Sequence, residues 1–181
     1  MAFARKSEPP LLYTIYQNMV DYRVRHGECF FCLAGREEEE QGQKGRLVAV
    51  NECFRAFVPF SPSEPFEVRI VPKDHISSFA EQLRNENAAF QFAGILKEVM
   101  RKVKKTLQQE VLGEENWQKA SDPPYLFRLY TAPNDDDSCG AYHWFFIISP
   151  QNTKKVGFER GTDQDVIPIF PEEAAAKLRA A

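Results

Sequence analysis

Two cysteines spaced as C-x-x-C, Cys29 and Cys32, are the residues whose type and spacing point most directly to chemistry. This spacing lets two thiolates bind one metal ion from a tight turn, although redox-active pairs share it. The chain has no second C-x-x-C, so a complete site needs ligands from elsewhere, and His75 and His143 would make a tetrahedral Cys2His2 zinc site. The alternative is that the cysteines and His143 are ordinary core side chains and that His75 lies in a surface turn.

Composition excludes several classes of function. The length of 181 residues suits one domain with a sizeable core. The net charge of −3 gives no general attraction for nucleic acid. The first ten residues lack the apolar region of a secretory signal, and the apolar runs are too short to cross a bilayer. We therefore expect a cytoplasmic protein with reduced cysteines that binds neither nucleic acid nor membranes.

The spacing of apolar residues predicts the elements that would position these side chains. A period near 3.6 predicts helices over residues 11–25, from Asn85 or Asn87 through Leu107, and over 172–179. Alternation and β-rich composition predict strands at 46–51, 54–60, 66–71, 126–131 and 143–149. Residues 36–45 are predicted to be a loop, and 157–170 to be irregular with a short strand. This order predicts an α+β fold, with a mainly antiparallel sheet and flanking helices.

Several separated motifs then carry a resemblance to a known family. The run from Gly45 to His75, GRLVAVNECFRAFVPFSPSEPFEVRIVPKDH, resembles the C-terminal half of galactose-1-phosphate uridylyltransferases. The match continues in order at PPY (123–125), TAP (131–133), YHW (142–144), GFERGT (157–162) and PEEAAAKLR (171–179). The resemblance implies a HIT-like fold, with residues 28–181 as a single domain and residues 1–27 as an N-terminal extension with a helix. It also implies nucleotide or nucleotide-sugar chemistry and, as a family-level expectation, a homodimer.

The resemblance also locates a departure from the catalytic pattern. Active members use the second histidine of His-x-His as a nucleophile that attacks the α-phosphate of a UDP-sugar, with Gln or Glu two residues later. Trp144 sets the register, so His143 matches the first histidine, Phe145 stands at the nucleophile and Ile147 at the Gln or Glu. A phenyl ring cannot attack phosphorus or bind metal. Moving the register by two residues makes His143 the nucleophile but leaves Trp144 unmatched.

Further site residues follow from the resemblance. It implies that Cys29, Cys32, His75 and His143 are the metal ligands, with zinc as the expected ion. It also predicts nucleotide contacts from Asn51 in the strand region, from Phe60 and Phe66 by stacking on a base, and from Lys73 and Arg160 at phosphates. The alternatives are a turn residue, core aromatics and exposed surface charges.

Three functions remain open from the sequence. The favoured one is a protein that binds a nucleotide or nucleotide-sugar and is catalytically impaired because Phe145 replaces the nucleophilic histidine. The second is an active nucleotidylyltransferase or nucleotide hydrolase that obtains its nucleophile from a catalytic partner chain. The third is a zinc-stabilised interaction domain without a small ligand.

Overall fold

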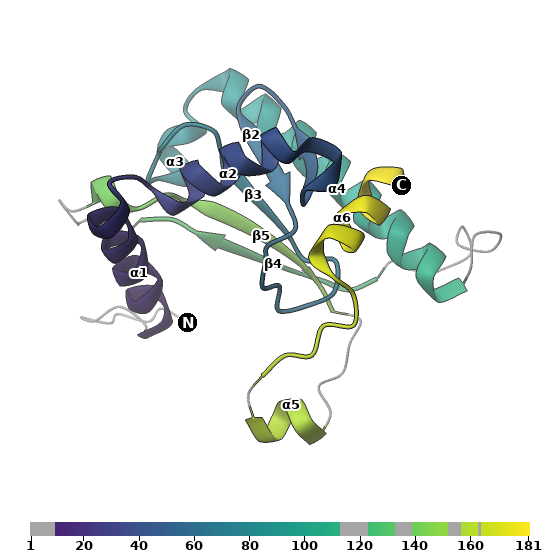
Figure 1. Ribbon diagram of the computed structural model, residues 1–181. Helices are drawn as coiled ribbons and strands as arrows, with labels where there is room; N and C mark the ends of the chain where they lie inside the picture. Colours follow the sequence, from purple (N-terminus) through teal and green to yellow (C-terminus); the bar gives the residue numbers. More distant parts are fainter. Residues whose placement is uncertain (1–9, 113–122, 133–138, 152–156, 163) are drawn as a thin grey trace, which may run out of the picture.

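A five-stranded antiparallel sheet forms the centre of the molecule, with strand order β1-β2-β3-β5-β4. The computed structural model describes residues 10–112, 123–132, 139–151, 157–162 and 164–181. The strands are β1 (Leu47–Val50), β2 (Phe54–Phe57), β3 (Val68–Pro72), β4 (Tyr125–Tyr130) and β5 (Phe145–Pro150). Helices cover both faces of the sheet (Figure 1). The predicted α+β fold with an antiparallel sheet is therefore confirmed.

The larger core lies between the sheet and two helices, α4 (Glu86–Leu112) and α6 (Pro171–Ala180). The predicted apolar stripe of α4 packs here, since Phe92, Val99, Val103 and Leu107 are buried and Leu96 is partly buried against them. Of the two predicted helix starts, the structure uses Asn85, whose side-chain oxygen accepts the backbone N–H of Ala88. From the sheet side, this core is completed by Val68 and Ile70 of β3, by Ile148 of β5 and by Trp144, which immediately precedes β5.

The opposite face of the sheet carries a smaller core and the two N-terminal helices. These are α1 (Pro10–His26) and α2 (Phe30–Gln41), which meets the short 3₁₀ turn η1 (Gly42–Lys44). The short helix α3 (Phe79–Gln82) lies between β3 and α4, and the turn η3 (Cys139–Ala141) lies between β4 and β5 at the end where α1 lies (Figure 1). None of the helices in the described ranges is long and apolar enough to span a membrane.

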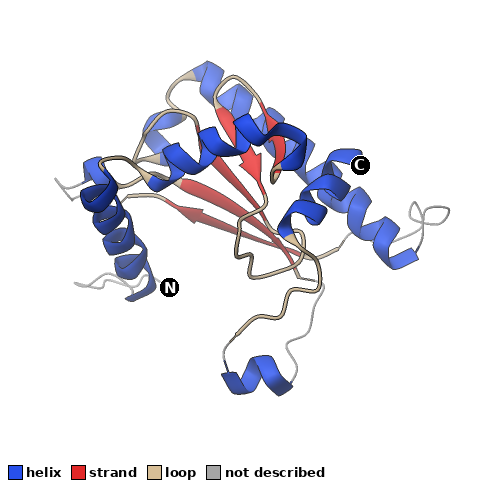
Figure 2. Cartoon of the chain, viewed as in Figure 1, coloured by secondary structure: helices blue, strands red, loops and turns tan. Residues whose placement is uncertain are grey.

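The predicted loop at residues 36–45 was wrong, because most of it continues helix α2 (Figure 2). Its run of glutamates consists of good helix formers and looks like a loop only because it lacks an apolar period. One helical face is nevertheless buried through Phe31, Gly35 and Glu38. The Glu38 carboxylate is 1% exposed and accepts hydrogen bonds from the backbone N–H and the guanidinium of Arg46. A buried charge therefore fixes α2 to the start of β1.

The C-terminal region also differs from the prediction. Residues 157–162 form the helix α5 (Gly157–Thr162), and no strand occurs in the described part of 157–170. Helix α5 contains no buried residue and projects away from the sheet (Figure 1). The chain then returns to the sheet as α6, in which Ala174, Ala175 and Leu178 are buried.

We expect Glu38→Gln to lower the free energy of unfolding by about 1–3 kcal/mol, since an amide cannot replace a carboxylate that accepts from several donors. Urea unfolding followed by circular dichroism measures the change. Glu37→Gln is the matched control, because Glu37 is exposed on the same helix, and its cost should stay within about 0.5 kcal/mol. Equal changes in the free energy of unfolding for the two variants would contradict a stabilising role for the buried Glu38 carboxylate.

Candidate metal centre and adjoining pocket

Cys29, Cys32, His75 and His143 form one cluster, with one ligand atom from each lying within 4.8 Å of the others. The two cysteines lie at the start of α2, where Cys29 is the N-cap residue and Cys32 is in the first turn. His75 follows β3, and His143 precedes β5. The cluster thus connects one helix to two adjacent strands that are far apart in sequence.

The distances within the cluster fit a tetrahedral ion. The Nδ1 atom of His143 is 3.5 Å from the Sγ atoms of both Cys29 and Cys32. The Nδ1 atom of His75 is 3.6 Å from Sγ of Cys32. Tetrahedral zinc with ordinary Zn–S and Zn–N bonds separates sulfur and nitrogen ligands by about 3.6 Å. The donor set and its spacing therefore fit a zinc-type site.

Hydrogen bonds outside the cluster orient both imidazoles. The Nε2 atom of His143 is 3.2 Å from the carbonyl oxygen of Pro72. The Nε2 atom of His75 is 2.9 Å from the carbonyl oxygen of Gly140, to which Arg23 also donates. Carbonyl oxygens only accept, so a proton on Nε2 of each histidine would satisfy these contacts and leave the Nδ1 lone pair facing the sulfurs. This is the outer-shell arrangement typical of metal-binding histidines.

The two thiols have strongly divided proton affinities. A hydrogen bond from Cys32 lowers the pKa of Cys29 to about 3, against the opposing effect of burial. The pKa of Cys32 is raised, first because its thiol donates to Cys29 and then because of burial. The pair therefore holds one negative charge near neutral pH, at a helix N-terminus that favours an anion. A divalent cation would stabilise the second thiolate as well.

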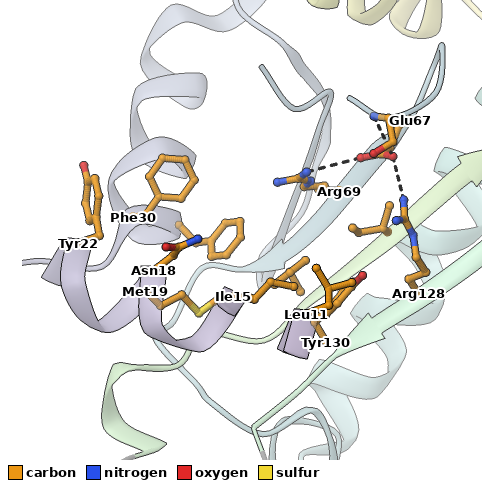
Figure 3. Close-up of a pocket in the computed structure, with 14 residues that line it drawn as sticks. Leu11, Ile15, Asn18, Met19, Tyr22, Phe30, Glu67, Arg69, Arg128 and Tyr130 are labelled. Carbon is orange, nitrogen blue, oxygen red and sulfur yellow. Dashed lines mark hydrogen bonds and ion pairs between the residues drawn. The ribbon is translucent and has the colours of Figure 1, made fainter. Parts of the chain in front are cut away.

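A cavity of about 430 Å³ opens on the same face of the sheet as the cluster. Phe145 and Ile147 of β5 contribute to its wall, and Leu11, Ile15 and Met19 of α1 form the opposite side (Figure 3). Strands β3 and β4 contribute Glu67, Arg69 and Arg128, with Glu67 just preceding β3. The cavity thus combines an apolar body with one charged end, as small-molecule sites commonly do.

Phe145 is a packed aromatic that also faces this cavity. The residue is 4% exposed, and its ring centroid lies 4.6 Å from that of Tyr130, at an interplanar angle of 11°. The centroid of the Phe31 ring is 4.8 Å away. Ile147, two residues further along, is also buried and lines the cavity. At both positions where the family pattern has polar groups, this chain therefore presents hydrocarbon to the cavity.

The predicted nucleotide contacts do not converge on this cavity. Asn51 supports the β1–β2 turn, where its side-chain oxygen accepts the backbone N–H groups of Cys53 and Phe54 and its amide donates to Gln91. Phe66 is buried in the main core, at a positive φ of 63°.

The remaining predicted contacts lie in three separate places. Lys73 pairs with Glu39 at 3.2 Å, and Arg160 is exposed on α5. Phe60 is 81% exposed beneath the guanidinium of Arg46 and lines a different hollow, of about 480 Å³, with Phe170. Their assignment to a nucleotide stays a prediction.

The charged end of the cavity was not identified from the sequence. Its signal lay in the motif FEVRIV, where Glu67 and Arg69 alternate with the core residues Val68 and Ile70. Because Glu67 and Arg69 are two residues apart in an extended segment, their side chains must lie on the same face of the sheet. The third member, Arg128, comes from β4 and could be placed beside them only by strand pairing, which puts Arg128 and Arg69 on either side of Ile147.

Comparisons with known proteins agree with this geometry. ADP-glucose phosphorylase from Arabidopsis thaliana is 30% identical over 173 residues, which is 94% of this chain and 43% of that protein. Galactose-1-phosphate uridylyltransferase from Thermotoga maritima is 32% identical over 148 residues, 78% of this chain and 42% of that protein.

Solved structures show the same relationship. The crystal structure of an ADP-glucose phosphorylase from Arabidopsis thaliana with bound ADP-glucose matches with a TM-score of 0.78 at 30% identity, covering 97% of this chain and 50% of that one. The chain thus spans half or less of the length of these relatives. No protein-family model matches the chain.

We expect the purified protein to contain close to one zinc per chain, and Cys32→Ser to abolish most of this metal, because a hydroxyl is a poor substitute for a thiolate ligand. Inductively coupled plasma mass spectrometry of the desalted protein gives the stoichiometry. Cys53→Ser is the matched control, since Cys53 is partly buried against the main core and does not belong to the cluster. Equal metal content in both variants would argue against the Cys2His2 site.

Proposed function

Because the chain belongs to the galactose-1-phosphate uridylyltransferase and ADP-glucose phosphorylase family, within the HIT-like superfamily, we propose that it binds a nucleotide or nucleotide-sugar without transferring it. The proposed binding site is the cavity of about 430 Å³ that Phe145 faces. The observation that carries the proposal is Phe145 itself, a buried hydrocarbon ring at the position of the family's nucleophilic histidine.

The packing around Phe145 supports binding without transfer. Nucleophilic catalysis at phosphorus needs a lone pair at this position and a polar group to stabilise the transferred phosphoryl group. Phe145 and Ile147 offer neither, and the Phe145 ring is held by Tyr130 and Phe31. In the shifted register His143 would be the nucleophile, but its two ring nitrogens face the cysteines and the Pro72 carbonyl.

In this proposal the metal is structural. Zinc would be held by Cys29, Cys32, His75 and His143, and a closed set of four protein ligands supplies stability rather than Lewis-acid chemistry. His143 is two residues before Phe145, so a fixed imidazole also fixes the first residue of β5. The cluster thereby holds α2 and β5, which both contribute to the cavity wall.

We also propose that residues 28–181 form a single domain of the family's C-terminal type and that residues 1–27 are an N-terminal extension with a helix. Helix α1 in this extension contributes Leu11, Ile15 and Met19 to the cavity. The extension would then close the binding site, and the ligand would lie between α1 and the sheet.

The test measures binding and transfer on the same protein. ADP-glucose, UDP-glucose, ADP and UDP should each be tried, and at least one should raise the melting temperature. A ligand that binds only the folded state adds about 2.7 kcal/mol to the free energy of unfolding at a hundredfold excess over Kd. Intact-mass spectrometry after incubation with either nucleotide-sugar should show no covalent nucleotidyl adduct.

The Arabidopsis ADP-glucose phosphorylase, incubated and measured in the same way, is the comparison protein. An adduct on this chain would contradict the proposal and favour the active-enzyme alternative. If that adduct disappeared in His143→Ala, the shifted register would be correct. No stabilisation by any of these ligands would reject nucleotide binding and leave the zinc-stabilised interaction domain.

A second observation favours a partner of the same chain. Strand β4 pairs only with β5 among the described strands, so one of its edges is unpaired. Leu126, Phe127 and Leu129 on this strand are between 41% and 49% exposed. Exposed apolar edge strands invite pairing with another strand. We propose that two copies meet at β4 in antiparallel register, which gives the self-complementary contact of a twofold dimer.

Leu126→Lys should shift a dimer to monomer, because it places a charge at the centre of the proposed contact. Light scattering coupled to size exclusion measures the mass. Val24→Lys, at an exposed position on α1, should leave the mass unchanged. If the wild-type protein is a monomer at high micromolar concentration, the dimer is excluded. The remaining candidate to cover the β4 edge is then a different, catalytic partner chain.

A further inference from the structure

Helix α1 buries little of its own surface. Of residues 11–26, Met19 alone is buried, and Leu11, Tyr13 and Val24 are each more than half exposed. The helix lies at one end of the sheet, where its neighbours are η3 and α2 (Figure 1). Helices in proteins are stabilised chiefly by packing of an apolar face. A few specific contacts therefore decide whether α1 stays in place.

Two aromatic contacts attach α1 beside the metal ligands. Tyr16 stacks on Tyr142, with ring centroids 6.3 Å apart, and Tyr142 directly precedes one ligand. Tyr22 lies edge to face with Phe30 at 5.3 Å, and Phe30 directly follows another ligand. The segments that the cluster positions are therefore also segments on which α1 rests.

Arg23 makes a more direct connection. Its guanidinium donates to the carbonyl oxygen of Gly140, and the same oxygen lies 2.9 Å from Nε2 of His75. Nη1 of Arg23 is itself 3.3 Å from that ring nitrogen. A carbonyl oxygen has two lone pairs, so it can accept from both donors. A continuous chain of contacts thus runs from the candidate ligand His75 through Gly140 to α1.

Metal coordination would strengthen this chain of contacts. When Nδ1 of His75 binds a cation, the ring orientation is fixed and its Nε2–H group becomes a stronger donor to the Gly140 carbonyl. That carbonyl then holds a fixed position for the Arg23 guanidinium. Without the cation the imidazole is free to rotate, and the acceptor of Arg23 loses its second donor.

The cluster is also accessible from solvent next to Arg23. A hollow of about 250 Å³ is lined by Arg23, Gly27, both cysteines of the cluster and His75. An ion can therefore reach the ligands while the chain stays folded. Gly27 ends α1 at this hollow with a positive φ of 77°, and a Cβ there would meet nothing within 4 Å. The backbone therefore has room to pivot between α1 and α2, and α2 is fixed to β1 by Glu38.

The same helix forms one wall of the cavity of about 430 Å³, to which it contributes Ile15, Met19 and Tyr22. Tyr22 is adjacent in sequence to Arg23, so one turn of α1 faces both the cavity and the hollow beside the cluster. A displacement of this turn would open both spaces together.

From these features we propose that Arg23 is a positioning residue that links metal binding to the closure of α1 over the cavity. Metal uptake closes the cavity wall, and metal loss releases it. Coupling between two sites is reciprocal, so whatever holds α1 in place also tightens metal binding by the same factor. The inference rests on the proposed metal and on the proposed role of α1, but it does not depend on the identity of the ligand in the cavity.

Hydrogen exchange followed by mass spectrometry, on the full chain without nucleotide, is the primary experiment. Removing zinc with a chelator should speed exchange in residues 11–26 about three- to tenfold, the factor that one partly exposed hydrogen bond supplies. Exchange in α4, which packs on the opposite face of the sheet, is the internal control and should change little.

Substitutions at Arg23 test the coupling with zinc present. In Arg23→Ala, exchange in residues 11–26 should match that of the metal-free wild type, and zinc affinity, measured by competition with a chromophoric chelator, should fall about three- to tenfold. Arg23→Lys should restore part of both, because an ammonium can still donate to Gly140. Arg25→Ala is the control, since Arg25 is an exposed α1 residue that pairs with Asp21 within the helix.

A purely structural role for Arg23 predicts a different pattern. Exchange in α1 would then rise in Arg23→Ala by the same factor with and without zinc, and zinc affinity would not change; this result would overturn the inference. Equal α1 exchange in the zinc-loaded and metal-free wild type would overturn it as well. If α4 also loses protection without zinc, the zinc-loaded variants decide: normal α1 exchange and normal zinc affinity in Arg23→Ala reject the coupling.

Failure of the inference differs from failure of the proposed function. A chain that binds no zinc removes the metal centre and the coupling together, but leaves nucleotide binding to the melting experiment. A chain that binds zinc without moving α1 rejects the coupling alone. A chain that shows the coupling but is stabilised by no nucleotide keeps the inference and rejects nucleotide binding.

Discussion

The two-residue period of β5 is the constraint on which the rest of the structure depends. His143, Phe145, Ile147 and Ser149 share one face of the sheet, and Trp144, Phe146 and Ile148 share the other. In the first set, His143 belongs to the candidate metal cluster, Phe145 and Ile147 line the cavity, and Ser149 donates to the Glu67 carboxylate. The second set packs on α4. Shifting the strand pairing of β5 by one residue would place Trp144 in the cluster and His143 in the main core. The fold and the site therefore depend on the same strand register.

The same face carries Phe145, at the position where the family pattern has its nucleophilic histidine. A histidine in contact with a ligand phosphate must stay partly solvated and correctly protonated, which limits how tightly it can be packed. Phe145 carries no such limit and stacks on Tyr130 and Phe31. The candidate metal cluster nearby includes His143, two residues before Phe145. Phenylalanine at position 145 is therefore compatible with an intact Cys2His2 cluster.

Buried charge is used twice, in two different ways. Glu38 is matched by Arg46, and the pair fixes α2 against β1. Glu67 is matched by more positive charge than it can neutralise, in the wall of a cavity. A balanced buried pair contributes to fold geometry, whereas an unbalanced one leaves a field that a ligand can complete. This difference separates the Glu38–Arg46 pair from the charged end of the cavity within one small domain.

Much of the architecture could be predicted from the sequence, because local periodicity and order of elements decide it. The helical spacing in α4, the alternation in β3 and β5 and the C-x-x-C with two histidines were all visible as patterns of residue type. The position of Phe145 in the family motif was visible as well, since Trp144 fixes the register. Residues 36–45 were misjudged because a helix whose contact is a buried glutamate has no apolar period to detect. The cavity and its charges were decided only by tertiary structure: α1 forms a wall by packing against the sheet, and Arg128 meets Glu67 through strand pairing. Such contacts join residues about 60 positions apart, and no local pattern in the chain records which strands become neighbours.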